Sequence, residues 1–278
     1  GFQQSHNIQL SGATEKINYM ASVGYLGQKG VIPVAESNRY NIRTNIGAKI
    51  TERLHVNLGI AYNYQKINEP VNPYTGDMAQ IFRQANRIPS FIAYKYSNGY
   101  YGYYGDGNPI AWLDMKSMDR INNKHTQINF SGEYKIFEGL KFKQVVGFQP
   151  FDNTSSKFVK EIQFYNNLTG APTQRQGVNN LTVYNAEIER LTLQSLLTYD
   201  KSFGKNQINA LAGFMDETNT ANYSSAYRQG FLNTNLEELV LGDSEGQVAT
   251  GGARKNILRS FFGRLNYSFD GKYLIEGN

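Results

Sequence analysis

The chain has 278 residues, a formal net charge of +5 and no cysteine, which excludes a disulfide framework and a thiolate metal site. Its lysines and arginines are scattered and form no run, which argues against a nucleic-acid-binding protein. No apolar stretch approaches the ~20 residues that a membrane-spanning helix needs, so an α-helical membrane protein is excluded as well.

In chain order, successive segments alternate between a mainly apolar and a mainly polar parity. Residues 39–50 place Tyr, Ile, Thr and Ala on one parity and Asn, Arg, Gly and Lys on the other, and residues 54–65 repeat the pattern. Such a period of two predicts a strand with one apolar and one polar face. The segments expected as strands are residues 6–13, 18–25, 39–50, 54–65, 126–136, 140–148, 190–200, 208–214 and 261–269, and a tenth strand begins within 273–278.

The connections between these segments differ greatly in length. Tight turns are expected at residues 14–16, 51–53, 137–139, 202–204 and 270–272. Between them lie much longer excursions, of which the longest runs from Lys66 to Asn122. Short turns on one side and long loops on the other are typical of a transmembrane β-barrel, with the turns in the periplasm and the loops outside the cell.

The length of the segments also favours a membrane barrel. Soluble strands average ~5–6 residues, whereas these run to about eleven, which at ~3.3 Å per residue and a tilt of ~40° spans roughly 28 Å. Aromatic residues stand near both ends of the apolar parity, as in the interfacial girdles of a barrel. Toward the long loops these are Tyr25, Tyr40, Tyr62, Tyr64 and Phe148, and toward the tight turns Tyr19, Tyr134, Tyr199, Tyr267 and Phe269.

Two alternatives stay open on this pattern. A soluble or surface-exposed β-sheet module that binds a glycan through its tyrosine-rich loop would also be rich in aromatic residues, because strands favour them. A passive porin would show the same alternation. Because the sequence begins at Gly1 rather than at Met and stops a few residues into a strand-like segment, we expect residues 1–278 to be one segment of a larger barrel domain.

The polar parity predicts the surface that faces the lumen of the barrel. Its side chains would contact either a solute or whatever fills the lumen, without covalent chemistry. The residues expected to face the lumen include Arg43, Lys49, Asn57, Asn63, Glu133, Lys135, Lys141, Lys143 and Arg264.

The loop between Lys66 and Asn122 is crowded with aromatic residues. Aromatic faces offer apolar area with polar tips and suit sugar rings or a partner protein, but a loop of this length also needs a small core of its own. The candidates for contact with a ligand or partner are Tyr94, Tyr96, Tyr100, Tyr101, Tyr103, Tyr104 and Trp112. In another loop, residues 235–242 could form a short helix that packs locally or against a partner.

Residues that could support catalysis or bind a metal are sparse. His6, His55 and His125 are isolated and show no metal-ligand spacing. Glu187 and Glu189 share one face of a strand, but a glycosidase needs two carboxylates that flank a cleft. There is no Gly-x-Ser-x-Gly elbow and no phosphate loop. We therefore expect no catalytic, cofactor-binding or metal site, and no enzyme.

Several short motifs occur along the chain in a definite order and spacing. They are HNIQLSG at 6–12, YMASVGYLGQKG at 19–30, RYNIR at 39–43, GNPIA at 107–111, GLKFK at 139–143, LTYDKSFGK at 197–205, NALAG at 209–213, SFFGRLNY at 260–267 and KYL at 272–274. In this order and spacing they resemble the barrel of the SusC/RagA family of TonB-dependent outer-membrane transporters of Bacteroidota. The resemblance covers most of the chain and weakens in the long loops.

This resemblance implies a ~22-stranded barrel in the outer membrane of a Gram-negative bacterium. It further implies an N-terminal plug inside the barrel, energy from TonB, a SusD-like surface lipoprotein as a cap, and an oligosaccharide or peptide as cargo. The chain departs from the full pattern because we find no plug, no TonB-binding segment and no closing C-terminal strand. The energy-coupling parts therefore cannot be assigned to residues here.

Overall fold

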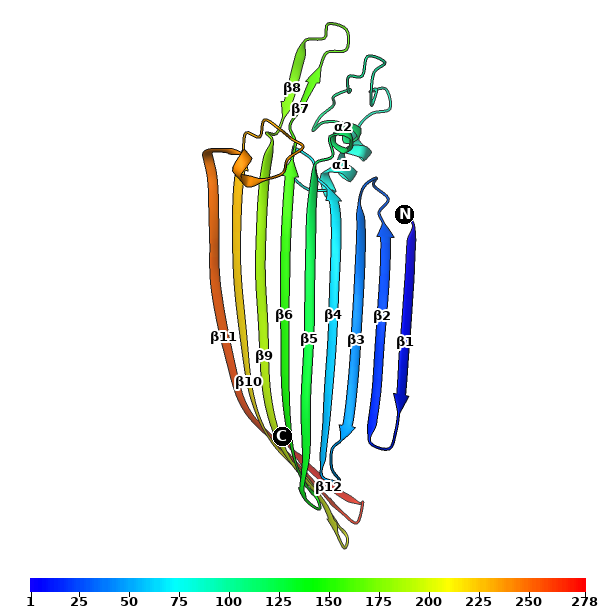
Figure 1. Ribbon diagram of the computed structural model, residues 1–278, viewed down its shortest axis with the longest axis vertical. Coiled ribbons are helices and arrows are strands. Elements are labelled where there is room, and N and C mark those ends of the chain that lie inside the picture. Colours follow the sequence, from blue (N-terminus) through cyan, green and yellow to red (C-terminus); the bar gives the residue numbers. More distant parts are fainter.

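The computed structural model of the protein describes residues 1–278 and consists of one large antiparallel sheet with small elements at one end. Ten strands follow one another in the order β1-β2-β3-β4-β5-β6-β9-β10-β11-β12, and β7 and β8 form a separate hairpin (Figure 1). The sheet strands are β1 (Gln3–Ala13), β2 (Ile17–Lys29), β3 (Glu36–Lys49), β4 (Leu54–Pro70), β5 (Met118–Phe137), β6 (Leu140–Val159), β9 (Asn180–Phe203), β10 (Asn206–Gln229), β11 (Asp243–Phe269) and β12 (Tyr273–Gly277).

The predicted all-β fold with an open meander of ten strands and five tight turns is confirmed. The strands at the C-terminal side are longer than expected, and β11 reaches 27 residues. In β10 the residues after Phe214 are mostly Thr, Asn, Ser and Ala on both faces. They carry no contrast between the faces, so the period of two fades although the ladder of hydrogen bonds continues in register.

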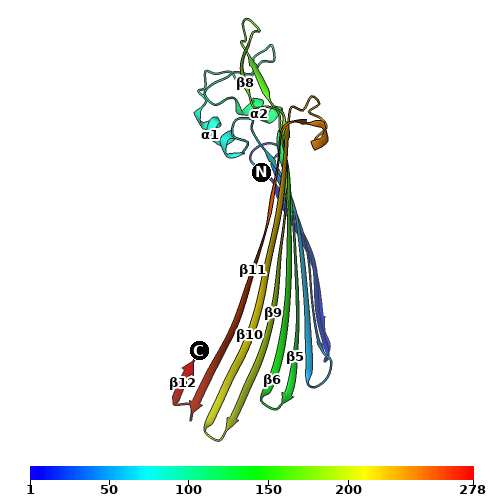
Figure 2. The same ribbon diagram turned by 90° about the vertical axis from the view of Figure 1, so that its left-hand side faces the viewer.

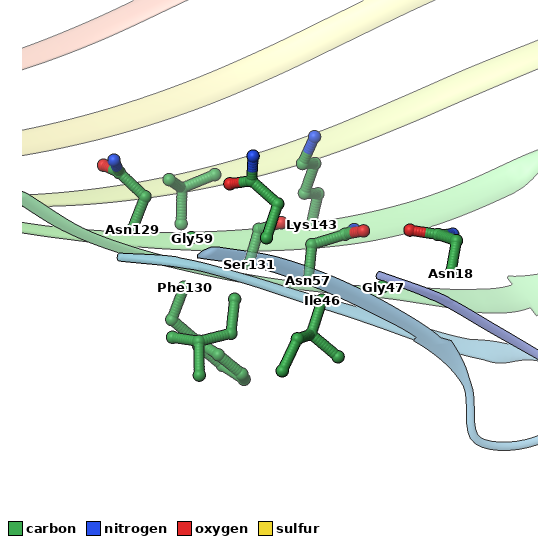
Figure 3. A pocket seen from close by; sticks show the side chains of 12 residues that line it. Asn18, Ile46, Gly47, Asn57, Gly59, Asn129, Phe130, Ser131 and Lys143 are labelled. Carbon is green, nitrogen blue, oxygen red and sulfur yellow. The ribbon is translucent and has the colours of Figure 1, made fainter. Parts of the chain in front are cut away.

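The two faces of the sheet differ in polarity and curvature. Residues directly opposite each other on neighbouring strands point to the same face, and the register joins Ile46 to Leu58 and Phe130 on one face. Figure 3 shows Ile46 and Phe130 pointing away from Asn57 and Lys143, and the sheet bends toward the polar side. The convex face is therefore apolar and the concave face is polar.

The apolar part of the convex face, here called the apolar band, follows one row of the ladder from β1 to β4 and crosses the strands obliquely from β4 to β11. Its aromatic edge lies at Tyr64 on β4, which the ladder connects across β5, β6, β9 and β10 to Ala253 on β11. On β11 the last convex aromatic residue is Phe261, eight residues closer to the tight turn. Eight residues of ~3.3 Å over five strand spacings of ~4.8 Å give a slope of roughly 45–50°, close to the ~35–45° tilt of barrel strands.

The long loops carry the remaining elements at the end of the sheet opposite the tight turns. Helices α1 (Ala79–Arg87) and α2 (Pro109–Asp114) lie between β4 and β5, and the hairpin of β7 (Ile162–Tyr165) and β8 (Pro172–Gln176) lies between β6 and β9. The one-turn η1 (Leu239–Leu241) takes up three residues of the segment in which a short helix was expected. Figure 2 shows α1 and α2 on one side of the sheet and η1 on the other.

Buried apolar residues occur only toward this end of the molecule. One cluster joins Ile32, α1, α2 and β7 around Trp112, and a second joins Phe158, Leu181 and Phe231. No second layer of this chain covers the convex face, where Ile8, Val23 and Ile42 are exposed. The sheet is therefore not half of a sandwich within this chain. No helix of the protein is long and apolar enough to cross a membrane.

Candidate functional site

The structure places all nine residues of the predicted lumen set on the concave face. The ladder aligns Lys49 with His55 and Glu133, and Glu133 with Lys143. Arg264 shares a row with Leu211, Thr198 and Lys141. Whether this surface lines the path of a solute stays a prediction, but the nine side chains do share one surface.

Near the tight turns this surface is charged. Lys141 forms an ion pair with Glu133 (3.2 Å) and Lys49 with Glu52 (2.7 Å). The hydrogen bond from Lys49 lowers the pKa of the Glu52 carboxyl, with a further contribution from the lysine charge. A hollow at this end is lined by Glu52, Glu133 and Asp200 and by Arg53, Lys135 and Lys141, of which Lys135 and Arg53 form no ion pair within the chain. This end of the concave face is thus mixed in sign.

Further along the strands the concave face contains a hollow built from asparagines and glycines (Figure 3). Gly47 lies between Asn18 and Asn57, whose amides would lie only 2.7–2.8 Å from a Cβ at position 47. Gly59 makes room for Asn45 in the same way, because the Asn45 Oδ1 would lie 2.8 Å from a Cβ at position 59. Each glycine therefore leaves the space in which an asparagine of the neighbouring strand lies flat.

The amides of this hollow are free to bind another group. Asn18, Asn45, Asn57 and Asn129 have no side-chain hydrogen bond within the chain, whereas Asn63 donates to Asn41 (2.8 Å) higher on the same face. An amide both donates and accepts. The hollow can therefore hydrogen-bond a neutral polar surface.

On the convex face the aromatic edge of the apolar band forms a continuous row of rings from β1 to β4. Ring centroids are 6.3 Å apart between His6 and Tyr25, 5.2 Å between Tyr25 and Tyr40, and 6.3 Å between Tyr40 and Tyr64. The Tyr64 hydroxyl donates to Asn122 on β5 (3.1 Å). Rings with an apolar body and a polar tip, in a row at the edge of an apolar surface, are the arrangement of an interfacial girdle.

The loop aromatics do not gather in one pocket. Trp112 is only 1% exposed and lies in the core of the loop, so a direct contact with a ligand is not supported for this residue. Tyr100 stacks on Tyr165 of β7 and Tyr103 meets Phe164 edge-on, each with ring centroids 5.0 Å apart. Tyr96 is half-buried, and Tyr94, Tyr103 and Tyr104 lie on the surface. Of the seven aromatic residues proposed to contact a ligand or partner, some thus belong to a small core of the loop instead.

Residues 71–117 and the β7–β8 hairpin, here called the cap, are held together by buried amides. Gln84 donates to the carbonyl oxygens of Tyr104 and Gly107, and Gln176 accepts from the Trp112 indole (3.0 Å). Asn108 caps α2 by accepting from the amides of Ile110 and Ala111. Sequence reasoning missed these residues, although Asn108 followed by Pro109 is a known signature of a helix start.

One ionisable cluster of the cap has altered pKa values. Burial, reinforced by the hydrogen bond to Asp114, raises the pKa of Tyr101. The hydrogen bond to the Tyr101 hydroxyl (3.1 Å) raises the pKa of Lys95. Lys95 and Asp114 are exposed and Tyr101 is half-buried against the core of the cap, so the cluster ties the Tyr-rich loop to the end of α2.

The residues tested for catalysis lie apart from one another. His6 belongs to the convex aromatic row, whereas His125 meets Phe151 edge-on at 6.0 Å on the concave face. Glu187 and Glu189 point to the convex face, away from the asparagine hollow. No group of three or more His, Asp and Glu side chains is arranged to hold a metal ion.

Comparison with known proteins gives one consistent result. A TonB-dependent receptor of Formosa agariphila is 27% identical over 283 residues, and the TonB-dependent receptor SusC of Bacteroides thetaiotaomicron is 23% identical over 292 residues. Each match covers 97% of this chain but only 27% and 28% of the relative. The chain thus spans little more than a quarter of the length of these relatives. No protein-family model matches it.

Solved structures agree on the fold. The RagAB peptide transporter superposes with a TM-score of 0.74 at 18% identity, over 99% of this chain and 31% of that chain. The ferric citrate transporter FecA superposes with a TM-score of 0.56 at 11% identity, over 96% and 32%. The resemblance to the SusC/RagA type of TonB-dependent receptor is confirmed by these matches, and the ten-stranded sheet has the fold of part of such a barrel.

Proposed function

We propose that this chain forms part of the wall of an outer-membrane β-barrel that imports a nutrient with energy from TonB. The convex face would meet lipid, the concave face would line the lumen, and the cap would stand outside the cell. The cargo would be an oligosaccharide or a peptide. The chain performs no covalent chemistry in this proposal.

The observation that carries the proposal is the apolar band. It is uncovered by the chain, uncharged and bounded by aromatic rings. Between β4 and β11 its edge is inclined by an angle close to the tilt of barrel strands. In water, exposed side chains such as Ile8 and Ile42 would each forgo on the order of 1.5–3 kcal/mol of burial free energy. Hydrocarbon removes this cost.

Two partners follow from the same proposal. A SusD-like surface lipoprotein would dock on the cap, whose surface exposes Phe91 and Tyr94. TonB would act through a region outside residues 1–278, and the plug would also lie outside these residues. Residues 1–278 would then be one segment of a single barrel domain.

The orientation of the wall can be tested with two neighbouring residues on opposite faces. The chain has no cysteine, so a nitroxide can be attached at Leu58→Cys or Asn57→Cys in the full gene product, reconstituted in lipid after replacement of any cysteine elsewhere. We expect the label at position 58 to be relaxed by oxygen, which concentrates in lipid, and the label at position 57 by a water-soluble nickel complex. Equal accessibility at both positions would contradict the orientation.

Transport is tested separately, in cells that carry the complete gene. Uptake of the cargo should stop when TonB is removed and return when TonB is restored. Uptake that continues without TonB would favour a passive porin. No uptake in either strain, with normal surface expression, would contradict import.

A further inference from the structure

Three tyrosines lie together on the concave face, beyond the level of the apolar band. Tyr223 and Tyr227 lie on β10, and Tyr184 on β9 is opposite Ser225, midway between them. Diagonal neighbours of this kind are roughly 7–8 Å apart. Tyr223 is 48% exposed, and the other two are half-buried. Neither the ion pairs nor the asparagine hollow described above use this group, here called the tyrosine track.

The ring of Tyr223 lies flat on the sheet. Its partner on β11 is Gly252, and a Cβ at that position would be only 3.0 Å from the ring carbon Cε1. On the other side, its partner on β9 is Ala186. Because both neighbours are small, one ring face can rest on β11 while the other is presented to the concave side.

The surroundings of Tyr184 and Tyr223 are neutral and capable of hydrogen bonding. From β4 to β11 the rows of these two residues contain no ionisable group besides the tyrosines, and include Asn123 and Asn153, which hydrogen-bond each other at 2.6 Å. The nearest ionisable residue in the row of Tyr223 is Arg39, five strands away on β3. The row of Tyr227 is charged, because it also holds Lys157, Asp119 and Glu69.

The track lies just inside the overhang of the cap. Gly76, near the start of the cap, lies close to Lys157: the lysine Nζ is 3.7 Å from the position of a Cβ on this glycine. Lys157 shares a row with Tyr227 on the concave face. A molecule that moves from beneath the cap along the concave face therefore meets the tyrosines before it reaches the asparagine hollow.

We propose that the tyrosine track binds a neutral oligosaccharide, an inference that rests on the proposed function. Sugar rings present apolar C–H faces that pack on aromatic rings, and their hydroxyls suit the amides and hydroxyls beside the track. A peptide carries charged termini and often charged side chains, for which the rows of Tyr184 and Tyr223 hold no counter-charge between β4 and β11. The surface around these two tyrosines therefore favours a neutral sugar over a charged peptide.

The test uses the full gene product, purified in detergent, and isothermal titration with neutral hexasaccharides of glucose, mannose, galactose and xylose, and with a neutral and a charged hexapeptide. We expect at least one hexasaccharide to bind. Tyr223→Ala should weaken its binding by roughly tenfold, the order of one aromatic contact, whereas Tyr223→Phe should stay within about twofold. Gly252→Val, which fills the space under the ring, should also weaken binding.

Asn222→Ala is the matched control, because residue 222 is adjacent on β10 but points to the convex face. It should leave binding unchanged, and heat-modifiable migration on gels should show that every variant is folded. The inference is overturned if no hexasaccharide binds, if Tyr223→Ala and Tyr184→Ala bind as the wild type does, or if only a peptide binds. TonB-dependent import of a peptide that Tyr223→Ala leaves intact would preserve the proposed transport and remove this inference alone.

Discussion

The ten-stranded sheet, here called the wall, and the cap at its end differ in where their apolar side chains lie. In the wall, apolar side chains such as Phe261 (85% exposed) stand uncovered on the convex face, and the strands are held by long ladders of backbone hydrogen bonds. In the cap, Trp112 (1% exposed) is enclosed by helices and a hairpin, and buried amides satisfy the turns. A core of its own belongs to a part that water surrounds, and an uncovered band to a part that lipid surrounds.

The largest effect is expected from Trp112→Ala in the cap. Deleting a fully buried Trp side chain costs ~3–5 kcal/mol. Hydrogen exchange on the full gene product in detergent should show lost protection in α1, α2 and β7 and unchanged protection in β2–β4. Phe91→Ala is the control, because Phe91 lies in the same loop but is 80% exposed. If the exchange of β2–β4 rises as much as that of the cap, the two regions are not independent.

The next largest effect is expected from a charge in the apolar band. Leu58→Arg places a guanidinium near the middle of the band on β4 and should cost ~2–4 kcal/mol of folding free energy in a bilayer. Asn57→Arg, on the concave face, should cost less than about 0.5 kcal/mol. Urea titration in lipid vesicles measures both values. Similar losses for the two variants would show that lipid does not contact the convex face.

The wall could largely be predicted from the sequence, because its information is local. In β3 and β4 the alternation places every other residue on one face, and a one-residue error in register would expose the wrong set. Asn57 was therefore predicted on the polar face. Its packing over Gly47 could not be predicted, because that contact depends on which residue of β3 lies opposite Asn57 on β4.

The cap could not be predicted in the same way. Its core joins Ile32, Trp112 and Ile162, three residues far apart in sequence that meet only because the strands between them pair. No local period marks them. The hairpin β7–β8 and the polar extensions of β9 to β11 also lacked a contrast between faces, so the sequence showed loops where the structure has strands.

A smaller effect of opposite sign is expected in the loop that joins β2 to β3, whose Ile32 packs in the core of the cap. Pro33 and Val34 form the centre of a turn closed by the Ala35 amide and the Ile32 carbonyl oxygen (3.3 Å), and Val34 has φ 66°. This position of a type II turn favours glycine, and a β-branched residue there is strained. Val34→Gly should therefore stabilise the loop by about 1 kcal/mol, the strain relieved less the added chain entropy.

Val31→Gly provides the matched control. Val31 is also exposed, at 77%, but has no positive φ, so glycine there should destabilise by roughly 0.5–1 kcal/mol. Amide exchange in residues 30–35 would report both changes. If the two variants shift exchange in the same direction, the strain assigned to Val34 is absent.

The smallest expected effect is a difference between the cap and the wall in how their stability depends on pH. The pKa values of Tyr101 and Lys95 are both raised in the folded cap, the first mainly by burial and the second mainly by their hydrogen bond. A group whose pKa is raised on folding stabilises the folded state fully below its unfolded pKa, which is ~10 for Tyr and ~10.4 for Lys, and loses this contribution as the pH rises through the folded value. Protection of the cap should therefore fall above about pH 10 relative to that of β2–β4. Tyr101→Phe removes the phenol and its hydrogen bond to Lys95, and should flatten this difference. A difference of the same size in Tyr101→Phe would assign the pH dependence to another group.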